Sequence, residues 1–311
     1  MFNRFFGLFF LVIPFTWGGS FIAGKYVVHE MDPFTSVMFR FLLSAGVMLP
    51  FLILKYRKTH PYILDVKFIK HIIIVVLTSG LGYHIFFFSA LKFTSPTNTA
   101  IIIALNPFFT AFAETFLFRR KRPYRFYMGF ILSFAGAIWV NLAKGGEIDF
   151  SSLGWGELFC LGAALSWTLY TLLAKATKKQ EWDALWINAY NYLLTGLILI
   201  PFLGNQLSPS FLSSISMAGW FGLLYMAIFP TVIGYTLFYI GVQKKGPGWA
   251  VTFIYLVPSI TAMLDFAFFR AVFTMPMFLG TTLVVIGLIT GNLTEKQKEF
   301  VKRVLNLRHH N

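Results

Sequence analysis

The stretch "PFTWGGSFIAGK" at residues 14–25 has a looser counterpart in "ALSWTLYTLLAK" at residues 164–175. Glycine and proline are frequent in membrane helices, so one match of this kind carries little weight. Further matches follow in the same order at a nearly constant offset of about 150 residues, which predicts that the chain consists of two homologous halves. The matched pairs are Trp17 and Trp167, Lys25 and Lys175, Pro107 and Pro258, Glu114 and Asp265, Gly129 and Gly280, and Gly136 and Gly287.

Long apolar runs make up most of both halves. Of the 311 residues, 57% are hydrophobic and 12% are charged, compared with roughly 25% charged residues in an ordinary soluble protein. Runs of about 20 apolar residues can each cross the hydrocarbon core of a bilayer as a helix. We therefore expect an all-α integral membrane protein with ten transmembrane helices, at roughly 5–27, 34–54, 71–91, 97–118, 125–143, 154–175, 184–203, 217–241, 249–269 and 275–293.

The odd number of helices in each half fixes how the halves are related. After five crossings the second half enters the membrane from the opposite side, so we expect two inverted five-helix repeats. The predicted boundaries are 1–148 for the first repeat, 149–293 for the second and 294–311 for a cytoplasmic tail. Inverted repeats are typical of secondary transporters. A duplication retained in a protein that transports nothing is the alternative.

The basic residues lie mainly between the apolar runs. A formal net charge of +14 could indicate a nucleic-acid partner, but this position argues against one. If the N-terminus is cytoplasmic, 21 of the 26 lysines and arginines fall in cytoplasmic segments. Lys92, Lys144 and Arg270 fall in outer segments, and Lys25 and Arg40 fall inside predicted helices. The bias predicts that both termini are cytoplasmic. The one cysteine, Cys160, lies in an apolar run and is interpreted as a packing residue.

Several motifs resemble the EamA family of the drug/metabolite transporter superfamily: "WGGSFIAGKYV", "FRFLLSA", "ALKFTSPTNTAIIIALNPFFTAFAETFLF" and "GFILSFAGAIWV". The resemblance covers essentially the whole chain. It implies a ten-helix carrier of the bacterial-type cytoplasmic (inner) membrane, with helices 1–4 and 6–9 around a central cavity. Such carriers move amino acids, related metabolites or toxic organic compounds, often outward. The Gly-Glu pair that commonly ends helices 4 and 9 in the family is replaced here by Phe118-Arg119 and Phe269-Arg270.

Polar and aromatic residues inside the predicted helices are the candidate substrate contacts. Proline frees a backbone carbonyl one turn earlier, so Pro107 and Pro258 point to cavity walls near the membrane midplane. Tryptophans away from the interfacial belts and a histidine in hydrocarbon also favour a cavity. Packing between helices is the alternative for each. The predicted substrate-binding residues are Trp17, Tyr83, His84, Asn106, Trp167, Asn191, Tyr235 and Tyr239.

Charged residues inside the helices are candidates for gating or coupling, because buried charges in a membrane need partners. Lys25, Arg40 and Asp265 fall on the outer side, whereas Glu114 and Lys175 fall on the inner side. We hypothesise that the first set closes an outer gate, the second closes an inner gate, and only one set is engaged at a time. The alternative for the two lysines is that they extend to lipid headgroups.

The sequence contains no P-loop, no metal-ligand spacing and no catalytic constellation. We therefore expect no enzyme activity and no cofactor. The predicted function is a secondary active or facilitative transporter of small organic solutes, working by alternating access and favouring efflux, with protons as a candidate coupling ion. An importer of an amino acid or cationic metabolite, or a membrane sensor or scaffold, are the alternatives. Substrate identity and oligomeric state stay open.

Overall fold

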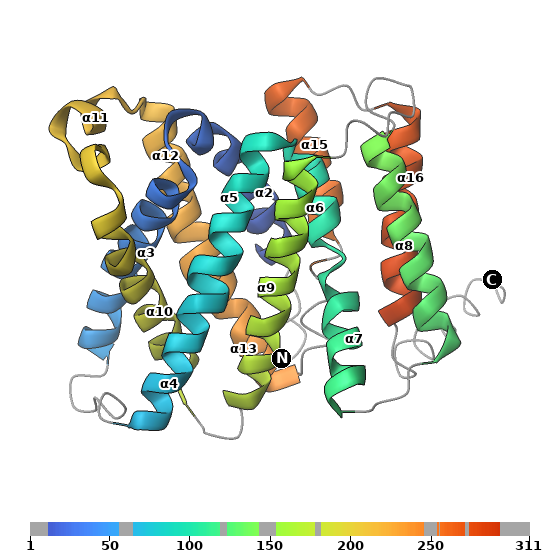
Figure 1. The fold of residues 1–311 in the computed structure, drawn as a ribbon, viewed down its shortest axis with the longest axis horizontal. Helices are drawn as coiled ribbons and strands as arrows, with labels where there is room; N and C mark the ends of the chain where they lie inside the picture. The colour runs from blue at the N-terminus through green and yellow to red at the C-terminus, as the bar shows by residue number, and fades with distance from the viewer. Residues whose placement is uncertain are drawn as a thin grey trace, which may run out of the picture.

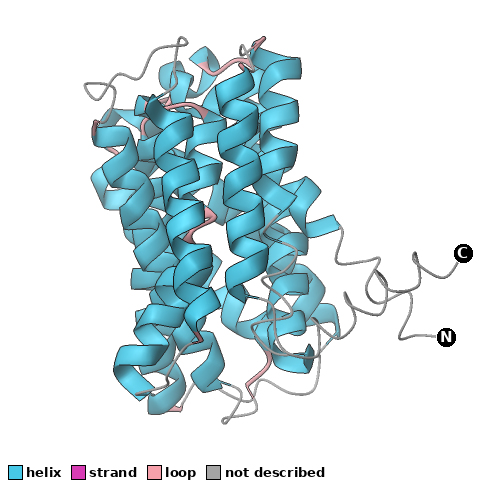
Figure 2. Cartoon of the chain, turned by 90° about the vertical axis from the view of Figure 1, so that its right-hand side faces the viewer, coloured by secondary structure: helices cyan, strands magenta, loops and turns pink. Residues whose placement is uncertain are grey.

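The computed structural model describes residues 12–55, 65–118, 123–142, 154–177, 182–245, 254, 256–270 and 274–292. Within these ranges the secondary structure is helical and contains no strand (Figures 1 and 2). The first half contains α2 (Val12–Glu30), α3 (Pro33–Lys55), α4 (Val66–Val75), η1 (Val76–Tyr83), α5 (His84–Phe93), α6 (Pro96–Ile103), α7 (Asn106–Phe118) and α8 (Tyr124–Leu142). The second contains α9 (Trp155–Thr177), α10 (Ala184–Leu199), η5 (Ile200–Phe202), η6 (Gly204–Leu207), α11 (Pro209–Ser214), α12 (Met217–Met226), η7 (Ala227–Tyr235), α13 (Thr236–Lys245), α15 (Val257–Phe269) and α16 (Met275–Asn292).

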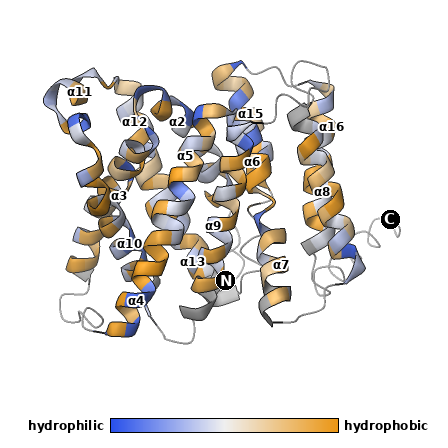
Figure 3. Cartoon of the chain, viewed as in Figure 1, coloured by the Kyte–Doolittle hydropathy of each residue, from blue (hydrophilic) through white to orange (hydrophobic). Residues whose placement is uncertain are grey.

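Five helical segments in the described ranges are long and apolar enough to cross a membrane. They are Pro33–Leu54, Val66–Phe93, Trp155–Leu173, Leu185–Phe202 and Met217–Gly241. Hydrophobic residues dominate the helices in Figure 3. These segments confirm an all-helical membrane protein and agree with five of the predicted spans. The total of ten spans and their inverted order stay predictions.

Side-chain caps define where several helices begin. The side chains of Asp65, Ser95, Asp183 and Ser216 accept hydrogen bonds from the backbone N–H groups of the first turn of α4, α6, α10 and α12. Each of these groups would otherwise lack a partner within its helix. Pro96 follows Ser95 at the first helical position, where no N–H is required.

Two π-helical segments occupy corresponding places in the two halves. η1 begins at Val76 and η7 begins at Ala227, which is the same offset as in the sequence matches. In η7, Pro230 has no N–H to donate, and the Thr231 hydroxyl donates to the Met226 carbonyl at 2.6 Å. Widened turns of this kind occur frequently at functional sites. Both lie in the central helices that carry Tyr83 and Tyr235.

The predicted helix at 97–118 is two helices. α6 ends at Ile103, a turn covers residues 104–105, and α7 begins at Asn106. The cause is Pro107, which cannot donate to the backbone one turn earlier. The expected break at Asn106 and Pro107 is thus present, and it is sharp enough to end the helix. In the second half, α15 begins at Val257 with Pro258 in its first turn.

α8 and α16 pack side by side along one edge of the molecule (Figure 1). A Cβ atom on Gly129 would lie 2.5 Å from the Gly287 carbonyl oxygen, and one on Gly136 would lie 2.6 Å from that of Gly280. Only glycine permits this approach of two backbones, which is a common device in membrane helices. The Ser133 hydroxyl also donates to the Val284 carbonyl at 3.0 Å.

Candidate functional site

Aromatic rings from both halves meet at the centre of the helical bundle. The ring centroids of Trp17 and Trp167 are 5.5 Å apart, with the planes at 85°. Tyr235 lies 5.5 Å from Trp17 and 5.3 Å from Trp167, and Tyr83 lies 5.0 Å from Trp167. Edge-on and tilted arrangements at these distances are favourable for aromatic pairs. Four of the predicted substrate-binding residues therefore form one cluster.

A cavity of about 40 Å³ lies within this cluster. It is lined by the four aromatic residues together with Ser20, Arg40 and Asn106. The break between α6 and α7 also contributes Ala104 to the wall. Its volume accommodates a few water molecules or one small ligand group. A larger solute requires movement of the surrounding helices or side chains.

His84 lies behind the cavity wall. Its side chain is fully buried, and Nδ1 lies 2.7 Å from the Ser79 carbonyl oxygen. The hydroxyl of Tyr235 lies 3.1 Å from Nε2. A carbonyl only accepts, so this network assigns the proton to Nδ1 and makes Nε2 the acceptor of the tyrosine hydroxyl. His84 therefore positions Tyr235, and the cavity lining does not include it.

The three remaining predicted substrate-binding residues differ in their placement. Asn106 lines the cavity, and its side-chain amide donates to the Ala164 carbonyl at 2.7 Å, which holds the α6–α7 break against α9. Asn191 is buried on α10, where its side-chain oxygen accepts from the Thr195 hydroxyl at 3.2 Å. Tyr239 is buried among hydrophobic residues. The cavity lining includes neither Asn191 nor Tyr239.

Arg40 forms part of the cavity wall. Its side chain is only 2% exposed, and Nε donates to the Thr231 hydroxyl at 2.8 Å. The guanidinium carbon lies 5.9 Å from the ring centroid of Phe87 and 6.0 Å from that of Phe88. The sequence interpretation grouped Arg40 with an outer gate, whereas in the structure this charge faces the centre of the bundle.

Lys25 and Asp265 both act on the connection between α5 and α6. The Lys25 ammonium donates to the carbonyls of Leu91 at 2.7 Å and Thr94 at 3.1 Å, at the C-terminal end of α5. The Asp265 carboxylate accepts from the hydroxyl of Thr97 at 2.6 Å and from its N–H at 3.2 Å, in the first turn of α6. A cation at a helix C-terminus and an anion at an N-terminus both complement the helix dipole.

Glu157 is a third charged residue at this connection. Its carboxylate accepts from the Thr94 hydroxyl at 3.0 Å. The sequence analysis did not include Glu157 among the candidate site residues, although the polar run "TSPTN" at 94–98 was an available signal for this contact. Side chains from α2, α9 and α15 thus converge on one short connection, which we call the outer cluster: Lys25, Thr94, Thr97, Glu157 and Asp265.

The predicted inner gate lies largely outside the described residues. The backbones of Glu114 and Lys175 belong to α7 and α9, but their side chains fall outside the part of the chain that the structure describes. The hypothesis of an inner gate therefore stays a prediction.

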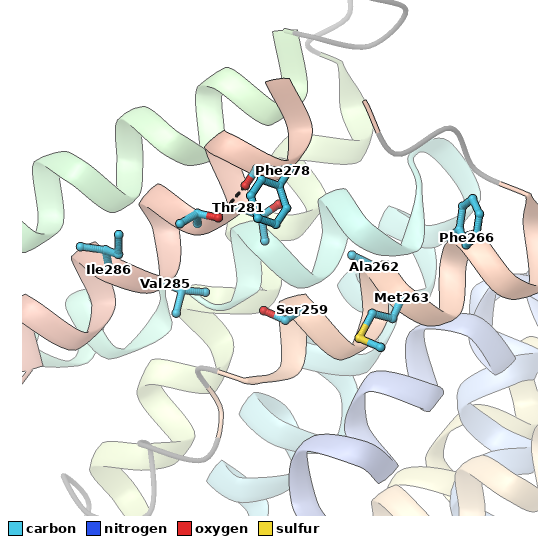
Figure 4. Close-up of a pocket in the computed structure, with 9 residues that line it drawn as sticks. Ser259, Ala262, Met263, Phe266, Phe278, Thr281, Val285 and Ile286 are labelled. Carbon is cyan, nitrogen blue, oxygen red and sulfur yellow. Dashed lines mark hydrogen bonds between the residues drawn. The ribbon is translucent and has the colours of Figure 1, made fainter. Parts of the chain in front are cut away.

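A second and larger cavity, of about 520 Å³, lies between α15 and α16. Figure 4 shows side chains from both helices around it. The Thr282 hydroxyl donates to the Phe278 carbonyl at 2.8 Å. Among the described lining residues the polar side chains are Ser259, Thr281 and Thr282, and none is charged. Such a lining suits apolar matter such as lipid chains. The smaller cavity, with its arginine and asparagine, is the candidate site for a polar solute.

Comparison with known proteins agrees with this architecture. The chain matches the EamA-like transporter family twice, over residues 5–142 and again over 154–292. It therefore belongs to that family and carries two EamA repeats, as the sequence motifs predicted.

Among its relatives is "Uncharacterized transporter YyaM" of Bacillus subtilis (strain 168), which is 28% identical over 88% of this chain and 89% of its own length. An "Uncharacterized transporter" of Archaeoglobus fulgidus is 30% identical over 80% of this chain and 84% of its own length. A solved crystal structure aligns with 94% of this chain and 98% of its own, with a TM-score of 0.66 and 19% identity, which shows similarity of fold alone. The protein is thus an integral membrane protein of the drug/metabolite transporter type.

Proposed function

We propose that this protein is a secondary active or facilitative carrier of small organic solutes that works by alternating access between two inverted five-helix repeats. The observation that carries the proposal is that equivalent residues of the two halves touch each other. Trp17 contacts Trp167. Tyr235 bonds to His84, and Ser133 bonds to Val284, each across 151 positions of sequence. A residue that contacts its own equivalent lies beside a two-fold axis.

The contact between α8 and α16 supports the inverted order. Gly129 and Gly280 are equivalent in sequence, and so are Gly136 and Gly287. Gly129 lies against Gly287, and Gly136 lies against Gly280. This reciprocity is the pattern of an isologous contact, and it requires the two helices to run in opposite directions. A pseudo-two-fold axis in the membrane plane has this effect.

Alternating access gives the central cavity and the outer cluster distinct roles. A substrate site beside the axis is reached from either side when the two repeats exchange conformations. The outer cluster ties α2, α9 and α15 to the α5–α6 connection and so favours closure on the outer side. The proposal includes ten membrane spans, divided between repeats at 1–148 and 149–293. It places the protein in the inner membrane with both termini in the cytoplasm and a cytoplasmic tail at 294–311. The proposed direction of transport is outward, with protons as the coupling ion.

Flux into and out of proteoliposomes tests this function directly. The full chain is reconstituted and offered a panel of amino acids, organic acids and organic amines, with and without a pH gradient. We expect saturable flux that Trp17→Ala and Trp167→Ala each reduce at least tenfold, because both rings line the cavity. Leu169→Ala is the matched control, since Leu169 lies on the same helix as Trp167 and is exposed.

The alternatives predict other results in the same experiment. An importer gives concentrative flux in the opposite direction under a physiological gradient. A sensor or scaffold binds a solute without moving it. Flux that persists unchanged in both tryptophan variants would place the route elsewhere and overturn the central site.

A further inference from the structure

Arg40 is a buried cation in the lining of the central cavity. Of its nitrogens, Nε donates to Thr231, and the described part of the chain offers Nη1 and Nη2 no hydrogen-bond acceptor. Tyr83 and Tyr235 line the same cavity as Arg40, and a tyrosine hydroxyl is neutral near pH 7. Phe87 and Phe88 present ring faces to it. No carboxylate in the described ranges lies within ion-pair distance of this guanidinium.

A charge in this position is costly unless it meets an opposite charge. Charged side chains within membrane spans are rare and normally face a partner or a wet cavity. Removing a guanidinium from water without an anion costs several kcal/mol in general. Arg40 lines the central cavity, so its free donors can be reached by whatever enters. The missing negative charge can therefore come from the solute.

We propose that Arg40 binds a carboxylate group of the transported solute, so that the carrier selects organic acids over organic amines. This inference rests on the proposed function. A guanidinium presents two parallel N–H donors, which match the two oxygens of a planar carboxylate. Among the described residues that line the cavity, there is no aspartate or glutamate that could pair with an ammonium group. This asymmetry argues against the cationic metabolite among the alternatives.

The neighbouring side chains define the rest of the solute. Trp17, Trp167 and Tyr83 provide flat apolar walls next to Arg40 in the same cavity. Such surfaces stack with an aromatic or unsaturated body. The preferred solute is accordingly a small organic acid with one carboxylate and an aromatic or otherwise flat apolar body. The cavity of about 40 Å³ holds its carboxylate, and the body enters as the aromatic walls separate.

Thr231 is the positioning residue for this arginine. Its hydroxyl accepts from Arg40 Nε at 2.8 Å and donates to the Met226 carbonyl at 2.6 Å, so both of its roles are fixed by the π-helical turn. With Nε bonded to Thr231, the Nη1 and Nη2 donors remain for a ligand. Serine retains the hydroxyl at this position, whereas valine has the shape of threonine without it.

Binding of three isosteric probes to the purified full chain tests the inference. The probes are 3-phenylpropanoate, 3-phenylpropanamide and 3-phenylpropylamine, followed by the fluorescence of the tryptophans in the cavity. We expect the wild-type protein to bind the carboxylate at least tenfold more tightly than the amide or the amine. Arg40→Gln should weaken carboxylate binding ten- to a thousandfold, which is about the range for breaking a desolvated charge pair. Binding of the amide should change little.

Three further variants keep the test decisive if Arg40→Gln does not fold. Arg40→Lys retains the charge but loses the fork, and should weaken carboxylate binding to a lesser degree. Thr231→Val should weaken it, and Thr231→Ser should restore it. Lys70→Gln, which removes an exposed cation from α4, is the control for general electrostatics and should have no effect. Equal binding of the carboxylate to wild type and Arg40 variants would overturn the inference, and so would tighter binding of the amine than of the carboxylate.

Flux separates this inference from the proposed function. If Arg40→Gln still transports the amine, the proposed carboxylate site is wrong, but the proposed carrier function is supported. If carboxylate binding depends on Arg40 but no solute is transported, the carboxylate site is supported and the carrier function is refuted.

Discussion

The hydroxyl of Tyr235 lies 3.1 Å from Nε2 of His84, the residue 151 positions earlier that corresponds to it in the first repeat. One bond thus joins the central helices of both repeats. His84 is fixed in turn by the Ser79 carbonyl at 2.7 Å from Nδ1. Because Tyr235 is also in ring contact with Trp17 and Trp167, this bond orients a wall of the central cavity.

Replacing both partners of this bond should cost less than the two single replacements together. His84→Phe leaves the Tyr235 hydroxyl and the Ser79 carbonyl without their partner, and Tyr235→Phe leaves Nε2 without one. Each buried group left in this state costs about 1–3 kcal/mol of unfolding free energy. In His84→Phe/Tyr235→Phe the unpaired groups of the bond itself are gone, so the double variant should lose less unfolding free energy than the sum of the two single losses. Thermal unfolding in detergent measures it. Additive losses would mean that the two side chains act independently.

Exchanging the charges of Lys25 and Asp265 should not restore function. A direct ion pair would tolerate the exchange, but the two residues bond to opposite ends of the α5–α6 connection. The exchange places a carboxylate against the carbonyls of Leu91 and Thr94, and an ammonium against the N–H of Thr97. Both contacts become repulsive, and both oppose the helix dipoles.

We therefore expect Lys25→Asp/Asp265→Lys to transport less than either single variant. Flux in proteoliposomes measures this, and Asp265→Asn, which keeps an acceptor for Thr97, should retain the most activity. Recovery in the exchanged variant would instead establish a direct pair of Lys25 and Asp265 as the outer gate.

The α8–α16 contact predicts a sharp difference between two glycines. A Cβ on Gly129 would meet the Gly287 carbonyl oxygen at 2.5 Å, whereas one on Gly46 of α3 would meet no atom within 4 Å. Gly129→Ala should separate two backbones and destabilise the protein by about 1–3 kcal/mol, as overpacking does in general. Gly46→Ala should be neutral or slightly stabilising, because alanine favours helix over glycine. Unfolding midpoints of the two variants in detergent decide the matter. Similar midpoints would show that the helices separate easily.

The sequence predicted the repeat because equal offsets survive in glycine, proline and tryptophan, whose shapes the fold requires. It also predicted the interruption at Pro107, which follows from a missing N–H. It did not predict the two π-helical segments, because these depend on hydrogen bonds between side-chain hydroxyls and backbone carbonyls of neighbouring turns. The place of Arg40 was missed for a related reason. Depth along a helix indicates how far a side chain lies from the membrane surface, but only packing against Thr231 and Phe87 decides which way it points.

The orientation in the membrane can be tested at a contact between two connections. The Glu30 carboxylate accepts from the N–H of Ser216 at 2.7 Å and from its hydroxyl at 2.5 Å, so the ends of α2 and α12 lie at the same surface. The short helix α11 lies at that end in Figure 1, and the start of α4 lies at the opposite end. The excess of basic residues in the segments around Lys67 predicts that the α4 end is cytoplasmic.

Cysteines introduced on the two surfaces distinguish the two orientations. Ser210→Cys on α11 should react with a membrane-impermeant thiol reagent in intact cells, and Lys67→Cys at the start of α4 should react only after the membrane is opened. Both positions are exposed, so access to the reagent is comparable. The native Cys160 is buried and should stay unlabelled in the parent protein, which serves as the control. The reverse pattern would invert the topology and move Lys25 and Asp265 to the cytoplasmic side. The outer cluster would then be the inner gate, while the axis through Trp17 and Trp167 would stay where it is.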